Sequence, residues 1–94
     1  MAKFMKQDVI QATPARLGGT KASRLMKVIL YCAADGTAVF KNGATDTGDT
    51  HLTIAGLAKT APSFDFTDVG GIEFDVSIFC TVTGTGNIAH CWFE

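Results

Sequence analysis

Apolar and polar residues alternate along most of the chain after Arg24. The clearest case is residues 72–83, IEFDVSIFCTVT, whose alternate positions would share one face and are Ile72, Phe74, Val76, Ile78, Cys80 and Val82. A period of two is typical of a β-strand with one buried face, and no segment after Arg24 keeps the 3.6-residue period of an amphipathic helix. The pattern therefore predicts an all-β protein.

Residues 24–33, RLMKVILYCA, are predicted to form a strand that is apolar on both faces. One face would hold Met26, Val28, Leu30 and Cys32, and the other Leu25, Ile29 and Tyr31 together with Lys27. Such a strand is covered on both sides or lies at a contact between subunits. We therefore expect contacts between copies to involve Leu25, Ile29 and Tyr31, and also Phe79, the apolar exception on the polar face of residues 72–83.

Turn signals divide the rest of the chain into short strands. The pair Asp35-Gly36 and the pair Asn42-Gly43 flank TAVFK (37–41), and the second pair predicts a hairpin into THLTIAGL (50–57). Residues 62–67, PSFDFT, would turn two phenylalanines inward, and NIAHCWFE (87–94) alternates as a last strand. Turns at intervals of about 8–12 residues are typical of a sandwich or jelly roll. We predict one antiparallel β-sandwich or jelly roll of about 6–8 strands.

Length and composition indicate that a domain of this size buries too little apolar surface by itself and gains more by association. The chain has 94 residues, enough for one domain, and only 18% of them are charged, below the usual share of about 25%. The longest uncharged apolar run, VILYCAA, is too short to span a bilayer, and the first residues lack the apolar core of a signal peptide. We expect a domain that associates with other copies and not with a membrane.

Charge is distributed unevenly along the chain. Residues 1–27 contain six basic residues and one acid, whereas residues 28–94 contain two lysines and eight acids. We predict a basic N-terminal arm over residues 1–23, with residues 3–12 either helical or extended, and a sandwich domain over residues 24–94. The arm would contact something negative, such as a neighbouring copy, or would simply be solvated. The candidate interaction residues in and beside it are Lys3, Lys6, Arg16, Lys21 and Arg24.

One stretch, TVTGTGNIAH (81–90), resembles a cofactor site. Gly84, Gly86 and Ala89 fit the G-x-G-x-x-A variant of the dinucleotide-binding fingerprint. That motif needs a following helix and an acidic residue about 20 positions later, and only five residues follow Ala89. We therefore predict no cofactor and a hairpin turn in which Gly84, Gly86 and Asn87 tolerate positive φ.

The remaining candidates for metal binding and catalysis are weak. Cys80, Cys91, His90 and His51 include no C-x-x-C pair, and adjacent strand residues such as His90 and Cys91 point to opposite faces. The third cysteine is Cys32, and all three fit reduced, structural thiols. Glu73 and Asp75 would lie about 7 Å apart on one strand face, a spacing usable in glycoside hydrolysis but more typical of a solvated face. We expect no metal, no catalytic residue and no enzyme.

The order of these features resembles that of a known group of proteins. KVILYCAADGTAVFKNG is followed by a T-x-x-G-D-T loop, then by LTI, PSFDFTDVGGIEF and a terminal GTGNIAHCWFE. Over residues 24–94 this resembles the small β-sandwich virion proteins of tailed bacteriophages, which decorate capsids or form the bases of fibres.

The resemblance implies a non-enzymatic structural protein of the virion, assembled in the host cytoplasm and usually trimeric. Its expected partners are other copies of the chain and a major capsid or other virion protein, with no specific nucleic acid. The alternative from another class is a carbohydrate-binding module. That function would need two or three coplanar exposed aromatic rings, for which Tyr31 and Trp92 are the candidates.

Overall fold

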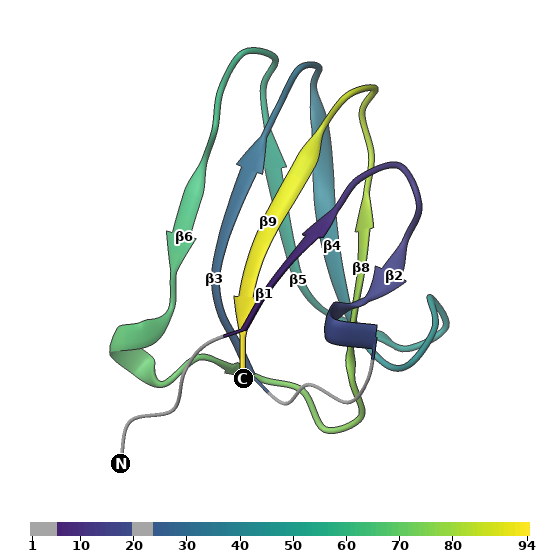
Figure 1. The fold of residues 1–94 in the computed structure, drawn as a ribbon, viewed down its shortest axis with the longest axis vertical. Coiled ribbons are helices and arrows are strands. Elements are labelled where there is room, and N and C mark those ends of the chain that lie inside the picture. The colour runs from purple at the N-terminus through teal and green to yellow at the C-terminus, as the bar shows by residue number, and fades with distance from the viewer. Residues whose placement is uncertain (1–5, 20–23) are drawn as a thin grey trace.

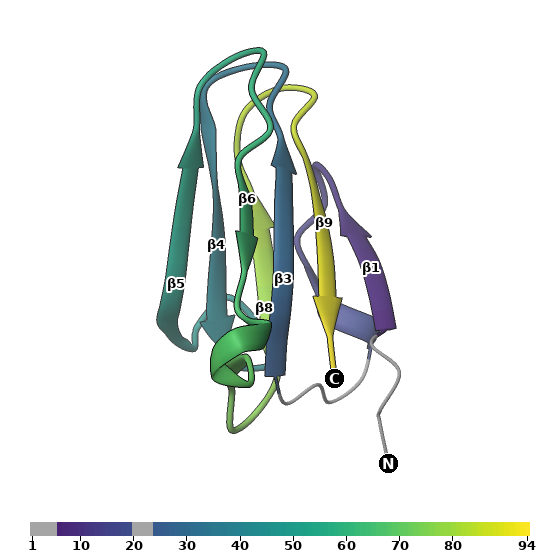
Figure 2. The same ribbon diagram turned by 90° about the vertical axis from the view of Figure 1, so that its left-hand side faces the viewer.

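The computed structural model describes residues 6–19 and 24–94, which form two antiparallel sheets packed face to face (Figure 1, Figure 2). Sheet A contains, in order, β1 (Lys6–Ile10), β9 (Ile88–Phe93), β3 (Arg24–Tyr31) and β6 (Ser63–Asp65), with β7 (Ile72–Glu73) also paired to β3. Sheet B contains, in order, β2 (Ala15–Arg16), β8 (Ile78–Val82), β4 (Gly36–Asn42) and β5 (Asp49–Gly56). Two 3-10 turns, η1 (Leu17–Gly19) and η2 (Thr67–Val69), complete the described structure. The predicted all-β sandwich is confirmed, with nine strands in the described residues.

The strand order is that of a jelly roll. If the two-residue strand β7 is set aside, each sheet has four strands, ordered β1-β9-β3-β6 and β2-β8-β4-β5. Nearly every connection crosses from one sheet to the other, and the first and last strands lie side by side in sheet A. Jelly rolls interleave two Greek keys in this way.

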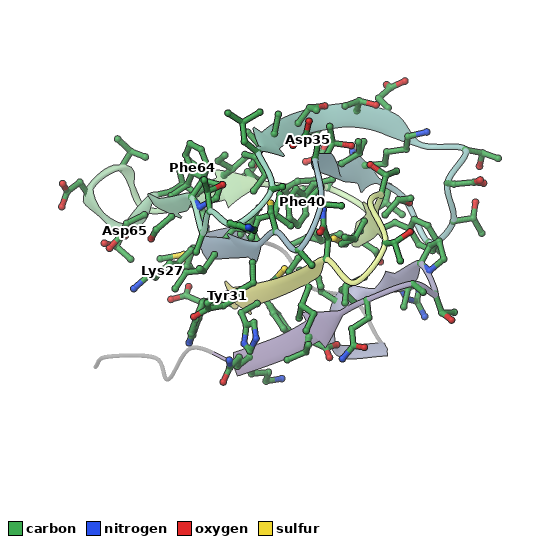
Figure 3. All side chains as sticks on the ribbon, turned by 90° about the horizontal axis from the view of Figure 1, so that it is seen from above. Lys27, Tyr31, Asp35, Phe40, Phe64 and Asp65 are labelled. Carbon is green, nitrogen blue, oxygen red and sulfur yellow. The ribbon has the colours of Figure 1, made fainter. Side chains whose placement is uncertain are left out.

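The core lies between the sheets and consists of the inward residues of the alternating strands. In β9 the burial alternates without a break, with Ala89, Cys91 and Phe93 inside. The largest fully buried side chains include Phe40, which lies between the two layers (Figure 3), and Phe74. Because the inner faces are apolar, each sheet covers the other and the hydrophobic effect holds the sandwich together.

A bulge alters the predicted faces of β3. The pairing of β3 with β9 shifts register between Leu25 and Lys27, so both Leu25 and Met26 are buried although they are adjacent. A bulge of this kind re-aims side chains locally. The prediction that Leu25 shares the outer face with Ile29 and Tyr31 is therefore wrong.

The described part of the leading segment belongs to the sandwich and is not an arm. Strand β1 pairs with β9, and β2 pairs with β8, so residues 6–19 pass from one sheet to the other. Leu17 is fully buried, and the backbone N–H of Gly18 donates to the carboxylate of Asp8 (2.8 Å). A Cβ at Gly18 would lie 2.9 Å from the ring of Phe93. The prediction of an arm failed because the two buried residues of this segment, Ile10 and Leu17, stand among polar residues and give little periodic signal. Residues 1–5 and 20–23 lie outside the described structure.

The predicted strand over residues 72–83 is two strands in different sheets. Strand β7 pairs with β3 in sheet A, whereas β8 pairs with β4 in sheet B. Between them the alternation changes phase, so that Val76 is 52% exposed and Ser77 is buried. The side-chain oxygen of Asn42 accepts from the N–H of Val76 (2.8 Å), which satisfies part of the crossing backbone. Alternation in the sequence predicted each strand but not the change of sheet.

The predicted turns have mixed outcomes. Strands β4 and β5 form the predicted hairpin, joined by a loop over residues 43–48. In contrast, Asp35-Gly36 and GTGN (84–87) are corners between sheets, because β3 and β9 lie in sheet A while β4 and β8 lie in sheet B. The hairpin prediction for GTGN is therefore wrong. Gly84 and Gly86 do adopt positive φ, as predicted, whereas Asn87 does not.

Asn87 joins the two corners at one end of the sandwich. Its side-chain oxygen accepts from the N–H of Ala34 (3.0 Å), and its amide nitrogen donates to the carbonyls of Ala34 (2.9 Å) and Thr83 (3.0 Å). The Asn87 side chain is buried, whereas Ala34 is half-buried and Thr83 is exposed, so these hydrogen bonds are partly shielded from water. One amide thus satisfies backbone groups of the β3–β4 and β8–β9 corners together.

Replacing Asn87 with alanine should destabilise the protein by about 1–3 kcal/mol, because it removes three hydrogen bonds to partly buried backbone groups of the two corners. Chemical denaturation measures this loss. Thr85→Ala, at an exposed position of the same corner, is the control and should change stability by less than about 0.5 kcal/mol. Equal losses in the two variants would contradict the role given to Asn87.

Replacing Leu17 with alanine should destabilise the protein by about 2–5 kcal/mol, because Leu17 is a core residue and the change leaves a cavity. A residue of a detached arm would have almost no effect in the same denaturation experiment. Gln11→Ala, at an exposed position of the same segment, is the control. A Leu17→Ala variant as stable as the wild type would contradict the packing of residues 6–19 into the sandwich.

Candidate functional site: an aromatic strip on sheet A

Tyr31, His90 and Trp92 form an aromatic strip on the outer face of sheet A. His90 and Trp92 alternate with buried residues of β9, and Tyr31 lies at the end of the neighbouring strand β3. The rings of Tyr31 and His90 make an edge contact with centroids 5.0 Å apart, and those of His90 and Trp92 lie 6.5 Å apart. Three rings from two strands thus form one continuous surface.

Hydrogen bonding and a cation hold this strip in place. The side-chain amide of Gln7 on β1 hydrogen bonds to Nδ1 of His90 (3.2 Å). The ammonium group of Lys27 lies over the ring of Trp92, 5.3 Å from its centroid. A cation over an indole ring is attracted by the electron density of its face. Both contacts restrict the rings and reduce the entropy lost when a partner covers them.

Apolar side chains extend the strip across three strands. Cross-strand pairing places Val9 and Ile29 on either side of His90, and Ile88 opposite Tyr31. Val9 is 40% exposed and Tyr31 is 45% exposed. The other residues of the strip are half-buried. Partly exposed aromatic and aliphatic side chains gathered on one face are typical of a surface that binds a partner.

Asp65 marks the polar border of this face. It pairs with Lys27 across β6 and β3, and its carboxylate accepts from the hydroxyl (2.7 Å) and the N–H (2.9 Å) of Thr67. The hydroxyl bond of Thr67, then its N–H bond and the charge of Lys27, lower the pKa of Asp65. Asp65 is therefore a fixed negative charge beside the cation that covers Trp92.

The basic residues predicted to interact are dispersed over the molecule. Lys6 is exposed on β1, and Arg16 is half-buried on β2, opposite Phe79. Arg24 donates to Glu73 (3.1 Å) and to the carbonyl of Gly70 (3.2 Å), which ties β3 to the chain around β7. Lys3 and Lys21 lie outside the described residues. Arg16 is in sheet B, whereas Lys6 and Arg24 lie on separate strands of sheet A with β9 between them.

The apolar residues predicted to interact are also separated. Ile29 and Tyr31 lie at the aromatic strip, Leu25 is in the core, and Phe79 is half-buried on the outer face of sheet B. A single contact surface therefore includes only Ile29 and Tyr31 of this set. Sequence reasoning considered Trp92 only for sugar binding and His90 only for metal binding, and it missed Val9. The alternation of residues 88–94 already placed His90 and Trp92 on one face.

The sulfur and carboxylate candidates do not gather into a site. Cys80 and Cys91 are free and fully buried between the sheets, whereas His90 points outward, as predicted for neighbours on a strand. A hydrogen bond with Cys80, together with burial, raises the pKa of the Cys91 thiol. Within residues 6–19 and 24–94, no group of three metal-ligating side chains lies together.

The predicted carboxylate pair does not share a strand face. Glu73 is in β7 and forms the ion pair with Arg24, whereas Asp75 lies in the segment that crosses to sheet B. The strand ends between these two residues, so the spacing expected from continuous β geometry does not apply.

Comparison with known proteins adds no relative: no family model, curated protein or solved structure matches the chain. In the part of the chain that is described, no helix has the length and apolar character needed to cross a membrane.

Thr67→Val should raise the pKa of Asp65 toward its ordinary value, because the change removes the hydroxyl bond and leaves the N–H bond. A carboxyl-detected NMR titration of both proteins measures the difference. Since the folded pKa of Asp65 is lowered, this bond contributes stability above the unfolded pKa, and that contribution is lost as the pH falls through the folded pKa. An unchanged Asp65 titration in the variant would contradict this assignment.

Proposed function

We propose that this chain is a non-enzymatic structural protein of a tailed-bacteriophage particle, which attaches to a capsid or other virion protein through the aromatic strip. The observation that carries the proposal is a row of rings on the outer face of a small jelly roll, with Tyr31 exposed and His90 and Trp92 half-buried. Jelly rolls serve as viral capsid and lectin domains, and the resemblance of residues 24–94 favours the first use. Because a fold alone does not determine function, the strip must account for the attachment.

The chemistry of the strip suits contact with a protein. Tyrosine and tryptophan dominate the binding energy of protein interfaces, since each buries a large rigid surface and keeps one polar group. Here the rings are flanked by the aliphatic residues Val9 and Ile29 and bordered by Lys27 and Asp65. An apolar centre with a charged border is the usual anatomy of such interfaces.

Particles of the phage that encodes the chain should contain it as a stoichiometric component. Gradient purification followed by mass spectrometry and electron microscopy tests this directly. Its absence from purified particles would overturn the proposal.

Tyr31→Glu should weaken attachment to those particles about tenfold or more, because it places a charge in the centre of the contact. Cosedimentation of the purified protein with particles that lack it measures the effect. Thr81→Glu, on β8 in sheet B, introduces the same charge on the opposite side of the sandwich and should bind as the wild type does. Equal binding by all three proteins would remove the strip from the attachment surface.

The second candidate is a carbohydrate-binding module, favoured by the exposed ring of Tyr31 and the half-buried ring of Trp92. The planes of His90 and Trp92 differ by 30°, but Tyr31 lies at 74° to His90. This strip offers at most two roughly parallel rings, fewer than a long sugar platform needs. Quenching of Trp92 fluorescence by glycans, with no binding to particles, would favour this candidate over the first.

A further inference from the structure

Two thiols of the core meet between the two sheets. Cys80 is on β8 of sheet B and Cys91 is on β9 of sheet A, and both side chains are fully buried in the same apolar core. A hydrogen bond joins the two thiols, and both cysteines are free. Strands β8 and β9 follow one another in the chain but lie in different layers (Figure 1). The thiols are therefore in contact across the interface between the layers.

The two sheets are close together on this side of the sandwich. Cα atoms of β1, the neighbour of β9 in sheet A, lie within 8 Å of Cα atoms of β8 in sheet B. Small side chains lie beside the pair, because Ala15 on β2 pairs with Cys80, and Ala89 is the inward residue before Cys91 on β9. A disulfide requires nearby backbones and side chains that point toward each other. The position of the pair therefore suits a covalent link between the layers.

The third cysteine lies elsewhere in the core. Cys91 pairs with Val28, and Cys32 is four residues further along the chain, a separation of about 13 Å at the rise of a strand. The Cys32 thiol donates to the carbonyl of Leu30 (3.8 Å) and lies against Gly56 of β5. Cys32 is also buried, so it serves as an internal reference for a core thiol in other surroundings.

We infer that Cys80 and Cys91 form a disulfide between the two sheets when the chain folds in the presence of an oxidised low-molecular-weight disulfide such as glutathione disulfide. One cysteine thiolate attacks a sulfur of the small disulfide, forms a mixed disulfide and releases one small thiol. The other cysteine thiolate attacks the cysteine sulfur of the mixed disulfide, which forms the Cys80–Cys91 bond and releases the second small thiol. Two protein thiols are thereby oxidised, and one small disulfide is reduced to two thiols that carry the two protons.

Burial determines when this reaction can occur. The hydrogen bond with Cys80 and then burial raise the pKa of the Cys91 thiol, so it stays protonated in the folded protein, and only a thiolate attacks a disulfide. Both sulfur atoms are also closed off from a reagent in solution. The exchange therefore proceeds while the chain folds or after it opens. The folded protein then keeps the oxidation state in which it folded, and this inference does not depend on attachment to a particle.

The disulfide would stabilise the folded protein. It closes residues 80–91 into a loop that contains the corner held by Asn87. A crosslink restricts the unfolded chain more than the folded one, in which the two thiols are already in contact. Oxidised protein should therefore unfold at a higher urea concentration than reduced protein.

Refolding the reduced, unfolded wild type with a mixture of glutathione and glutathione disulfide tests the inference. The product should have lost two hydrogen atoms by mass spectrometry, and only Cys32 should alkylate after denaturation. Digestion without reductant should give peptides joined through Cys80 and Cys91. The product should keep the near-ultraviolet circular dichroism of protein refolded with dithiothreitol and should unfold at a higher urea concentration. The already folded protein should crosslink about ten times more slowly in the same mixture, because both sulfurs are buried.

Single cysteine variants provide matched controls. Cys32→Ala should still form the crosslink, whereas Cys80→Ala should form none and should gain no stability from the oxidising mixture. Three alkylated thiols after refolding at every ratio of oxidised to reduced glutathione, a crosslink that includes Cys32, or a crosslinked product without the native spectrum would overturn the inference. Equal rates for the folded and the refolding protein would overturn the control by burial. The wild type alone gives the mass, the linked peptides and the rates, so the test does not require Cys80→Ala to fold.

Discussion

The longer strands β4, β5, β8 and β9 each have one apolar face that the opposite sheet must cover, and the rest of the structure follows from that constraint. The chain meets it by crossing between the sheets at nearly every connection. Each crossing removes backbone groups from the ladders and leaves them to be satisfied by other means. Asn87 does this at one end for two corners at once, and Asn42 does it at the other end for the passage from β7 to β8. Two buried or half-buried amides therefore make the jelly-roll path compatible with a dry interior.

The sequence predicted the fold class because burial of one face is a local property of a strand. The alternation in β8 and β9 appears in the structure, and in β8 the inward residues are those predicted, Ile78, Cys80 and Val82. What could not be predicted is which strands pair, because pairing joins residues far apart in the sequence. The corner at GTGN and the hairpin at Asn42-Gly43 carry similar local turn signals. Only the tertiary position of the following strand distinguishes a corner from a hairpin.

The burial of the leading segment, residues 6–19, also could not be predicted from local pattern. Ile10 and Leu17 enter the core, yet they stand among polar residues and carry no periodic pattern. Their burial depends on β9 and β8, strands formed by the last part of the chain. The aromatic strip likewise depends on the pairing of strands that are far apart in the sequence. Tyr31 and His90 are neighbours because β3 pairs with β9, so the strip could be predicted as two separate apolar positions but not as one surface.

A sandwich with a filled interior offers partners two kinds of surface, the outer face of a sheet and the edge of a sheet. The two differ in how well they distinguish one partner from another. The outer face of sheet A presents side chains, so its partner must match the rings of Tyr31, His90 and Trp92 in shape and chemistry. The edge at β5 presents backbone groups, which any strand can pair with, so discrimination there must come from register and charge. The outer face of sheet A and the edge of sheet B at β5 lie on separate sides of the molecule, so a partner bound to the face leaves the edge accessible.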